Sequence, residues 1–427
     1  MNNPLRKING GVPSYCCANE IVIEAIFEHS RNSKIPVLIE GTANQINQFG
    51  GYTGLTPEKF RDYIFSIADK FKFPREKIII GGDHMGPLVW SHLNSKEAMS
   101  NASELVKLCV LAGFKKIHLD TSMKLADDNP NEKLSDDIIA ERGAILFQAC
   151  ENAYQDLLKQ NPHEIRPVYI IGSEVPIPGG VQNQNDELQI TTAQEFENTI
   201  NAYKTQFKNY GLENRFDDVI GVVVQPGVEF GDKNIHAYER DKAKNLTAVL
   251  KNYPNLVLEG HSTDYQTPEN LKLMVEDGVK ILKVGPALTF ALREGLFALS
   301  MIENELLKNN SEKANFIDTL ENEMLRHPKH WENYYHGSEY EKKLARKYSY
   351  SDRSRYYLNL PEVKNSINKL FANIDKNFER LIPGLLKQFM PVQYEKLRAG
   401  ILKHDARSLV YDYVARVVDV YNSAVKI

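Results

Sequence analysis

The stretch Ile78-Ile79-Ile80-Gly81-Gly82-Asp83-His84 decides the fold that this sequence predicts. Three consecutive isoleucines are typical of a strand that is buried on both faces, and the run stops at two glycines and an acid–histidine pair. Parallel α/β folds carry their catalytic side chains at such carboxyl ends of strands. Asp83 and His84 are therefore candidate functional residues.

Seven other stretches repeat this design, in which a short apolar run ends in polar residues and precedes a segment with helical periodicity. The eight predicted strands cover residues 14–18, 37–43, 78–83, 116–121, 168–175, 219–225, 256–261 and 281–285. Strict alternation of such apolar strands with helices indicates a parallel sheet covered by helices. Eight repeats favour a closed (β/α)8 TIM barrel over an open sheet.

The pattern changes beyond about residue 310, where buried-strand runs stop and prolines and glycines divide the chain into short helical segments. We therefore expect a TIM barrel over residues 1–309 and a helical appendage over residues 310–427, packed on the barrel mouth. Within the appendage, Arg353 and Arg355 could bind phosphate or carboxylate groups of a substrate. The alternative is an Arg–Asp bridge that fixes the appendage to the barrel.

Composition excludes several classes of protein. The chain has 427 residues, 42% of them hydrophobic, and a net charge of −4, which gives no basic face for nucleic acid or anionic lipid. Its four cysteines lack the spacing of a zinc knuckle and are expected to be reduced. No apolar run approaches the roughly eighteen residues of a membrane span, and no signal peptide is evident. We expect a cytoplasmic, oligomeric protein with a small-molecule substrate.

Polar side chains at the predicted strand ends indicate a metal site. Nitrogen and oxygen ligands that suit zinc, or alternatively manganese or nickel, are His84, His261, Glu259 and Gln225. Carboxylates that could move protons beside a metal-polarised carbonyl are Asp83, Asp120 and Glu174. For each histidine the alternative is a hydrogen-bonded core or rim residue.

Further polar residues are assigned to substrate binding. The loop after the second strand is rich in amides, which suit the hydroxyl groups of a sugar; they are Asn44, Gln45, Asn47 and Gln48. Ser122, Asp264 and Lys283 are placed in the same group. Lys283 could instead form a Schiff base, although an inward lysine is more often ion-paired. No Walker-type loop occurs, which argues against a kinase.

Eight motifs resemble the accessory, so-called non-catalytic, subunit family of class II D-tagatose-bisphosphate aldolase. They are Asn44–Gly54 (NQINQFGGYTG), Gly81–Pro87 (GGDHMGP), His118–Ser122 (HLDTS), Glu174–Gly180 (EVPIPGG), Val224–Phe230 (VQPGVEF), Glu259–Gln266 (EGHSTDYQ), Lys283–Arg293 (KVGPALTFALR) and Tyr350–Tyr357 (YSDRSRYY). The resemblance covers nearly the whole chain. The same family has also been labelled tagatose-6-phosphate kinase, and some members are described as ketose 4-epimerases.

The resemblance implies a component of an aldolase that acts in ketose metabolism of the tagatose or galactitol type. It implies a ketose or ketose phosphate as substrate and a catalytic aldolase subunit as partner. The sequence is also distantly similar to the zinc-dependent class II aldolases, whose base and metal ligand would be Asp83 and His84. Their other two metal histidines fall near Gln225 and Glu259, where this sequence departs from the pattern, although His261 could replace one. The alternatives are a self-sufficient metal-dependent 4-epimerase of tagatose and fructose, and a non-catalytic scaffold.

Overall fold

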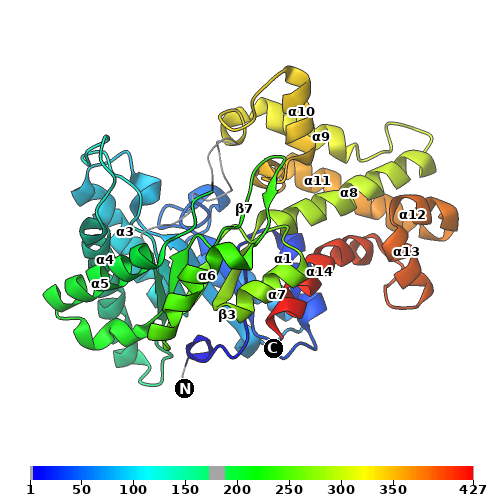
Figure 1. The fold of residues 1–427 in the computed structure, drawn as a ribbon. Coiled ribbons are helices and arrows are strands. Elements are labelled where there is room, and N and C mark those ends of the chain that lie inside the picture. The colour runs from blue at the N-terminus through cyan, green and yellow to red at the C-terminus, as the bar shows by residue number, and fades with distance from the viewer. Residues whose placement is uncertain (1–2, 173–187, 427) are drawn as a thin grey trace.

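The barrel predicted from the alternation of strands and helices is present. The structure is a computed structural model that describes residues 3–172 and 188–426. Eight parallel strands close in the order β1-β10-β9-β6-β5-β4-β3-β2 (Figure 1). Their bounds are β1 Val12–Tyr15, β2 Val37–Thr42, β3 Ile78–Met85, β4 Lys116–Leu119, β5 Val168–Ile171, β6 Val219–Val224, β9 Val257–Gly260 and β10 Val279–Val284. A two-stranded antiparallel hairpin, β7 Glu229–Phe230 and β8 Ile235–His236, follows β6.

Each barrel strand is followed by a helix, as expected. These helices are α1 Glu20–Ser30, α2 Pro57–Lys70, α3 Ser95–Leu111, α4 Asp136–Gln160, α5 Ala193–Asn209, α6 Arg240–Val249, α7 Pro268–Glu276 and α8 Pro286–Leu306. Local sequence explains where several begin. Thr56 caps α2 by accepting a hydrogen bond from the Lys59 backbone N–H, and Pro57 occupies the first helical position, where no N–H is needed.

We call the part of the barrel interior at the amino ends of the strands its lower half and the part at the carboxyl ends its upper half. The lower half is apolar. Residues two apart on a strand share a face, so Leu38 lies below the inward-facing Glu40, and Ile281 lies below the inward-facing Lys283. A separate apolar cluster contains these two residues, with Ile79 from β3 and Leu5 from the N-terminal segment. The larger apolar core lies between the strands and the surrounding helices. The polar site is therefore confined to the carboxyl end of the strands.

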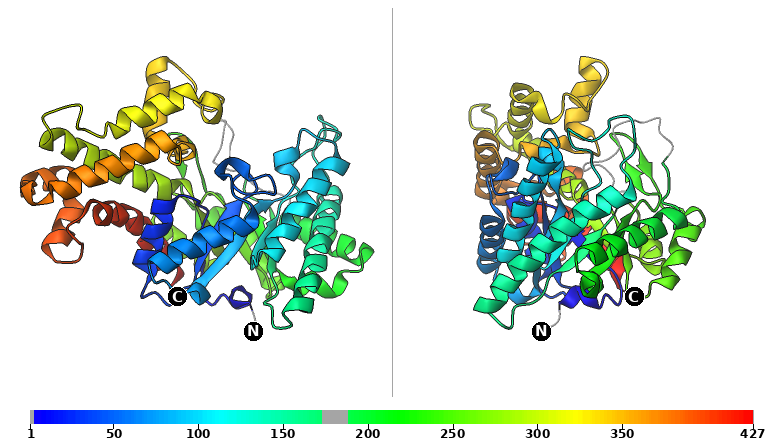
Figure 2. Two further views of the ribbon diagram at one scale, coloured as in Figure 1. Left: turned by 180° about the vertical axis from the view of Figure 1, so that it is seen from behind. Right: turned by 90° about the vertical axis from the view of Figure 1, so that its left-hand side faces the viewer.

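The C-terminal region is helical. It contains α9 Phe316–Arg326, α10 Glu339–Tyr348, α11 Pro361–Lys376, α12 Pro383–Phe389, α13 Pro391–Arg398 and α14 Ala406–Val425. Figures 1 and 2 show α9–α13 extending to one side of the barrel, whereas α14 returns to it. α14 packs against α1, α7 and α8, and the Tyr411 hydroxyl donates to Glu24 Oε2 at 2.6 Å. Across the described ranges, no helix is both long enough and apolar enough to cross a membrane.

A short C-terminal segment reaches the barrel mouth. It contains the 3-10 helix η8 Arg353–Tyr356, which follows Asp352. Asp352 accepts hydrogen bonds from the Arg293 guanidinium at 2.9 Å and from the Thr289 hydroxyl at 2.6 Å, both on α8. The Tyr265 hydroxyl donates to the Tyr350 carbonyl at 2.6 Å. These contacts fix the segment beside the carboxyl ends of the strands.

Candidate active site

Strand β3 breaks its regular alternation at its carboxyl end. The register with β4 shifts between Gly82 and Met85, and His84 has a φ of 48°. In a regular strand, Asp83 and His84 would face opposite sides of the sheet, whereas both line the cavity at the barrel mouth here. A left-handed conformation at a non-glycine residue costs on the order of 1–3 kcal/mol and is concentrated at functional sites.

Two lysines and several carboxylates form a buried ion network above the apolar half of the barrel. Lys116 Nζ lies 2.7 Å from Glu40 Oε1 and 2.7 Å from Glu259 Oε2. Lys283 Nζ lies 2.8 Å from Asp83 Oδ1 and also pairs with Glu40. Paired in this way, the buried charges avoid most of the penalty of isolated ones.

The ion network keeps the amine of Lys283 protonated. Burial opposes its charge, but Asp83, Cys16 and Glu40 raise the pKa of the amine well above its usual value. A Schiff base requires a neutral amine. The ion-paired alternative for this lysine is therefore the one that the structure shows.

Three histidines meet above this network. The ring centroids of His84, His118 and His261 lie 4.8–5.2 Å apart. Nδ1 of His84 hydrogen-bonds to Asp120 Oδ2 at 2.8 Å, and Nδ1 of His118 lies 3.0 Å from Asp83 Oδ1. A carboxylate on Nδ1 is the usual way in which proteins orient a histidine whose Nε2 binds a metal.

Four residues are placed to hold a metal ion. Donor atoms of Asp83, His118, Glu259 and His261 all lie within 4.8 Å of one another. Nε2 of His118 is buried and has no hydrogen-bond partner among the described residues, so it is available as a ligand. Nitrogen and oxygen donors of this kind suit zinc or another first-row divalent ion. The residues present therefore fit the metal that the sequence predicts.

Electrostatics favour the protonation states that a metal needs. Burial opposes ionisation of Asp83, but His84 and Lys283 hold its pKa well below its usual range. Burial likewise opposes the charge of Glu259, while Lys116 and Lys283 lower its pKa. Burial lowers the pKa of His261 to about 4, which keeps its imidazole neutral. Ionised carboxylates and neutral imidazoles are the metal-binding forms.

A cavity of about 110 Å³ opens beside the histidines. Five of the predicted substrate-binding residues line it, namely Asn44, Gln45, Asp264, Lys283 and Arg355. The predicted ligands His84 and His261 line it as well. The structure therefore brings these predicted residues together at one cavity, although they come from five separate parts of the chain.

Other predicted residues make contacts that hold local structure. Gln225 Oε1 accepts hydrogen bonds from the Gly227 and Val228 backbone N–H groups, which stabilises the turn after β6. Asn47 Oδ1 accepts from the Phe49 and Gly51 backbone within its own loop.

The remaining predicted residues also have structural contacts. Gln48 donates to the Asn101 carbonyl at 3.0 Å. Ser122 donates to Asp120 Oδ1 at 2.7 Å, and Arg353 donates to the His330 carbonyl at 3.0 Å. Glu174 lies outside the described residues.

Sequence reasoning did not assign two important residues of the site. His118 lies in the fourth predicted strand and begins the HLDTS motif, but it was not proposed as a metal ligand. Lys116 begins β4, where an isolated lysine has the pattern of an exposed strand end. Its burial depends on Glu40 and Glu259, which come from other strands. No local signal could have identified that pairing.

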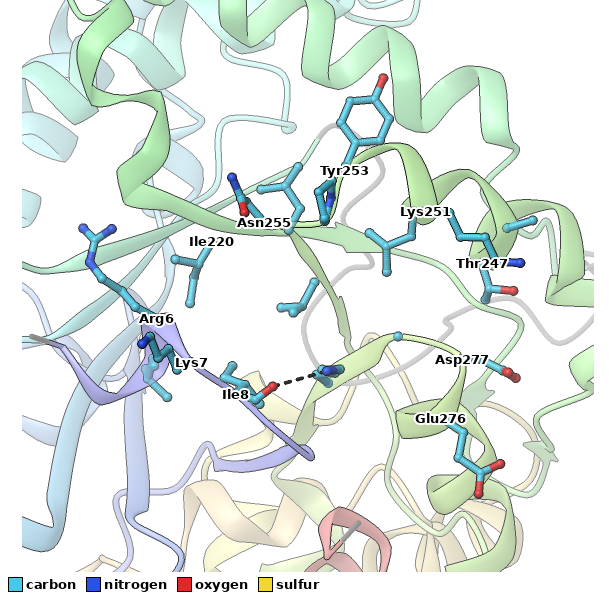
Figure 3. Close-up of a pocket in the computed structure, with 18 of the residues that line it drawn as sticks. Arg6, Lys7, Ile8, Ile220, Thr247, Lys251, Tyr253, Asn255, Glu276 and Asp277 are labelled. Atoms are coloured by element: carbon cyan, nitrogen blue, oxygen red, sulfur yellow. Dashed lines mark hydrogen bonds between the residues drawn. The ribbon is translucent and has the colours of Figure 1, made fainter.

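A larger cavity, of about 820 Å³, lies at the opposite, amino end of the strands (Figure 3). The N-terminal segment with Arg6 and Ile8 forms one side. Lys251 comes from a 3-10 helix that precedes β9, and Glu276 is the last residue of α7, which precedes β10. Lys280 Nζ donates to the Ile8 carbonyl at 3.2 Å, as the dashed line in Figure 3 shows. Basic and acidic side chains are mixed along its wall, in contrast to the converging donors at the mouth.

Comparison with known proteins matches the chain to a family model and to a solved structure. The family model described as D-tagatose-1,6-bisphosphate aldolase subunit GatZ/KbaZ-like matches residues 2–426. A probable tagatose 6 phosphate kinase from Sinorhizobium meliloti 1021 is 40% identical, with a TM-score of 0.86; the match covers 97% of this chain and 100% of that one.

Two aldolases also match over most of their length. The YdjI aldolase from Escherichia coli K12 is 12% identical, with a TM-score of 0.39 over 87% of this chain and 98% of that one. A fructose-bisphosphate aldolase from Campylobacter jejuni is 14% identical, with a TM-score of 0.41 over 87% and 90%.

Proposed function

Because this chain belongs to the GatZ/KbaZ-like family of D-tagatose-1,6-bisphosphate aldolase subunits, we propose that it acts on a ketose at a metal site of its own, as a component of such an aldolase. The observation that carries this proposal is the convergence of four donor residues, Asp83, His118, Glu259 and His261, at the barrel mouth. A purely structural subunit would gain nothing from burying these charges, because apolar residues of similar volume are usually at least as stabilising.

The side chains have distinct roles in this proposal. A divalent ion held by His118, Glu259 and His261 would polarise the carbonyl of the ketose, which leaves the carboxylate of Asp83 to act as the base. The ionised carboxylate of Asp83, which lines the cavity, accepts the proton of the C4 hydroxyl. The C3–C4 bond then breaks, its electron pair passes to the C2 carbonyl, and an aldehyde forms at C4. Asp120 is a positioning residue, because it orients His84 through the 2.8 Å hydrogen bond.

Substrate binding is assigned to side chains of the cavity wall. Asn44 and Gln45 offer amide groups to the sugar hydroxyls. Arg355 is the cation for a phosphate group: it lines the cavity, and its guanidinium donates hydrogen bonds to backbone carbonyls and to the Tyr356 hydroxyl. The segment with Arg353 and Arg355 is proposed to cover the mouth and limit access of water.

A second candidate function is 4-epimerisation by the chain alone. The rings of Tyr52 and Tyr356 pack edge to face at 5.1 Å and join the loop after β2 to the C-terminal segment at the mouth. A mouth covered in this way would retain the aldehyde fragment. If that fragment turns before the C3–C4 bond forms again, the configuration at C4 is inverted. Tagatose and fructose, or their phosphates, would then interconvert.

Product analysis separates these functions. The purified chain is incubated with tagatose, fructose and their phosphates, with zinc, manganese or nickel or with none. Release of a trapped aldehyde supports the aldolase component, and appearance of the C4 epimer supports the epimerase. Asp83→Asn should lower either rate by about 10²–10⁴-fold, whereas Asp62→Asn on the exposed face of α2 should not.

The proposed partner, a catalytic aldolase subunit, enters the same test. Adding it to the chain should raise the rate of cleavage if the two form one enzyme. Two results together would contradict the proposal and indicate a scaffold. The chain alone would convert no substrate with any of the metals, and the partner would be fully active when mixed with Asp83→Asn.

A further inference from the structure

The cavity of about 820 Å³ at the amino end of the strands (Figure 3) has the size of a small-molecule site. Pockets that bind small ligands enclose about 300–1,000 Å³. Part of its wall is apolar: Leu5, Ile220 and Leu256 line it and are each at most 8% exposed. Leu5 and Ile220 belong to the apolar cluster of the lower half of the barrel. This lower half therefore lies between the cavity and the mouth.

The N-terminal segment that forms one wall of this cavity is fixed in place. Asn3 Nδ2 donates to the Lys115 carbonyl at 2.8 Å, which holds the start of the segment. The hydrogen bond from Lys280 Nζ to the Ile8 carbonyl holds it again farther along the chain. A ligand therefore meets a wall that is already formed, so binding does not have to order this segment.

Most of the negative charge on the wall is already paired. Glu276 and Asp277 each accept a hydrogen bond from the Arg240 guanidinium at 2.8 Å, and Arg240 does not line the cavity. Figure 3 shows both carboxylates pointing away from the cavity. Asp217 is the one acidic side chain of the wall that has no ion pair among the described residues.

The positive charge on the wall is largely unpaired. The amines of Lys7, Lys244 and Lys251 line the cavity and form neither an ion pair nor a hydrogen bond within residues 3–172 and 188–426. Lys244, Thr247 and Lys251 are spaced three and four residues apart along α6 and the 3-10 helix Leu250–Asn252, so they share one face. The cavity therefore combines an apolar surface with an excess of free cations.

We propose that this cavity binds a small organic anion. The apolar or aromatic body of the ligand lies against Leu5, Ile220 and Leu256, and its phosphate or carboxylate group pairs with Lys244 and Lys251. A cation would be repelled by the unpaired amines, and an uncharged ligand would leave them without a partner. The site is separate from the ketose chemistry at the mouth and does not depend on it.

Two related fluorescent probes test this assignment. Anilinonaphthalene sulfonate has apolar rings and an anionic group, and phenylnaphthylamine is its uncharged counterpart. The wild type should bind the sulfonate more tightly. Replacing both exposed lysines of α6 and its extension, by Lys244→Ala with Lys251→Ala, should weaken binding of the sulfonate about fivefold and leave that of phenylnaphthylamine unchanged. Ala248→Trp, which fills the cavity from the same face, should weaken binding of both probes.

The matched control is Lys59→Ala with Lys96→Ala, which removes two exposed lysines outside the cavity and should bind both probes as the wild type does. Displacement of the sulfonate by naphthyl phosphate and by naphthoate then identifies which anionic group the lysines prefer.

Three results would overturn the proposal. One is equal affinity for the sulfonate in the two double variants. Another is an unchanged affinity of Ala248→Trp for both probes, which would place the probes outside the cavity. The third is failure of both naphthyl phosphate and naphthoate to displace the sulfonate from the wild type.

Discussion

The two halves of the barrel interior differ in chemistry although the same strands build both. On β2 the inward residue changes from Leu38 to Glu40, and on β10 it changes from Ile281 to Lys283. The lower half is apolar and packs in the ordinary way, whereas the upper half buries charges that must be paired. Packing below therefore carries stability, whereas apolar residues of similar volume would stabilise the upper half at least as well as its buried charges do.

The largest expected effect comes from removing one cation of the upper half. Lys116→Met leaves Glu40 and Glu259 buried without the amine between them, which should cost about 3–5 kcal/mol of the free energy of unfolding at pH 7. The comparison in the lower half is Leu38→Ala, which creates a cavity and should cost about 2–5 kcal/mol. Denaturant unfolding of both variants and of the wild type measures these losses.

The pH dependence of the two losses distinguishes their causes. In Lys116→Met, Glu259 loses an amine that lowers its pKa, so protonation of this carboxyl should reduce the loss as the pH falls toward 5. The loss in Leu38→Ala should be nearly independent of pH, because no charge is involved. Equal pH profiles for the two variants would show that Lys116 acts only as packing.

Glu229 gives a smaller effect at the rim of the upper half. Burial raises the pKa of this carboxyl from 4.5 to about 7, and a hydrogen bond from the Phe230 backbone offsets only part of that rise. An acid with a raised folded pKa contributes stability below its unfolded pKa and loses it as the pH rises through the folded value. Glu229→Gln, which cannot ionise, should therefore match the wild type at pH 4 and exceed its stability by up to about 3 kcal/mol at pH 8.

Thermal unfolding of wild type and Glu229→Gln between pH 4 and pH 8 checks this expectation. A constant difference across the range would mean that the carboxyl of Glu229 does not titrate there. Asp241→Asn, at an exposed position on α6, is the matched control and should show no pH-dependent gain.

The barrel was predictable because its signal is local. Most barrel strands contain a short apolar run, and several helices have their own cap, as at Thr56 and Thr267. The position of Asp83 at the barrel mouth was predictable for the same reason, because it follows an apolar run and two glycines.

Much of the site depends on strand register, which the sequence does not state. The pairing of Lys116 with Glu40 and Glu259 joins three strands that are distant in the chain. The irregular conformation of His84 leaves no mark in the sequence beyond the two glycines before it. Asn47 was predicted to bind the substrate. Amide side chains also form hydrogen bonds to the backbone of their own turn, as Asn47 does here.

The account depends most on a metal site in the upper half of the barrel, and zinc titration tests it directly. The measurement compares the affinity of wild type, His118→Ala and the exposed control His92→Ala for the ion. We predict one tightly bound equivalent in the wild type and in His92→Ala, and at least tenfold weaker binding in His118→Ala, which lacks the buried Nε2 donor. Equal affinity in all three proteins, or no binding by the wild type, would contradict the account.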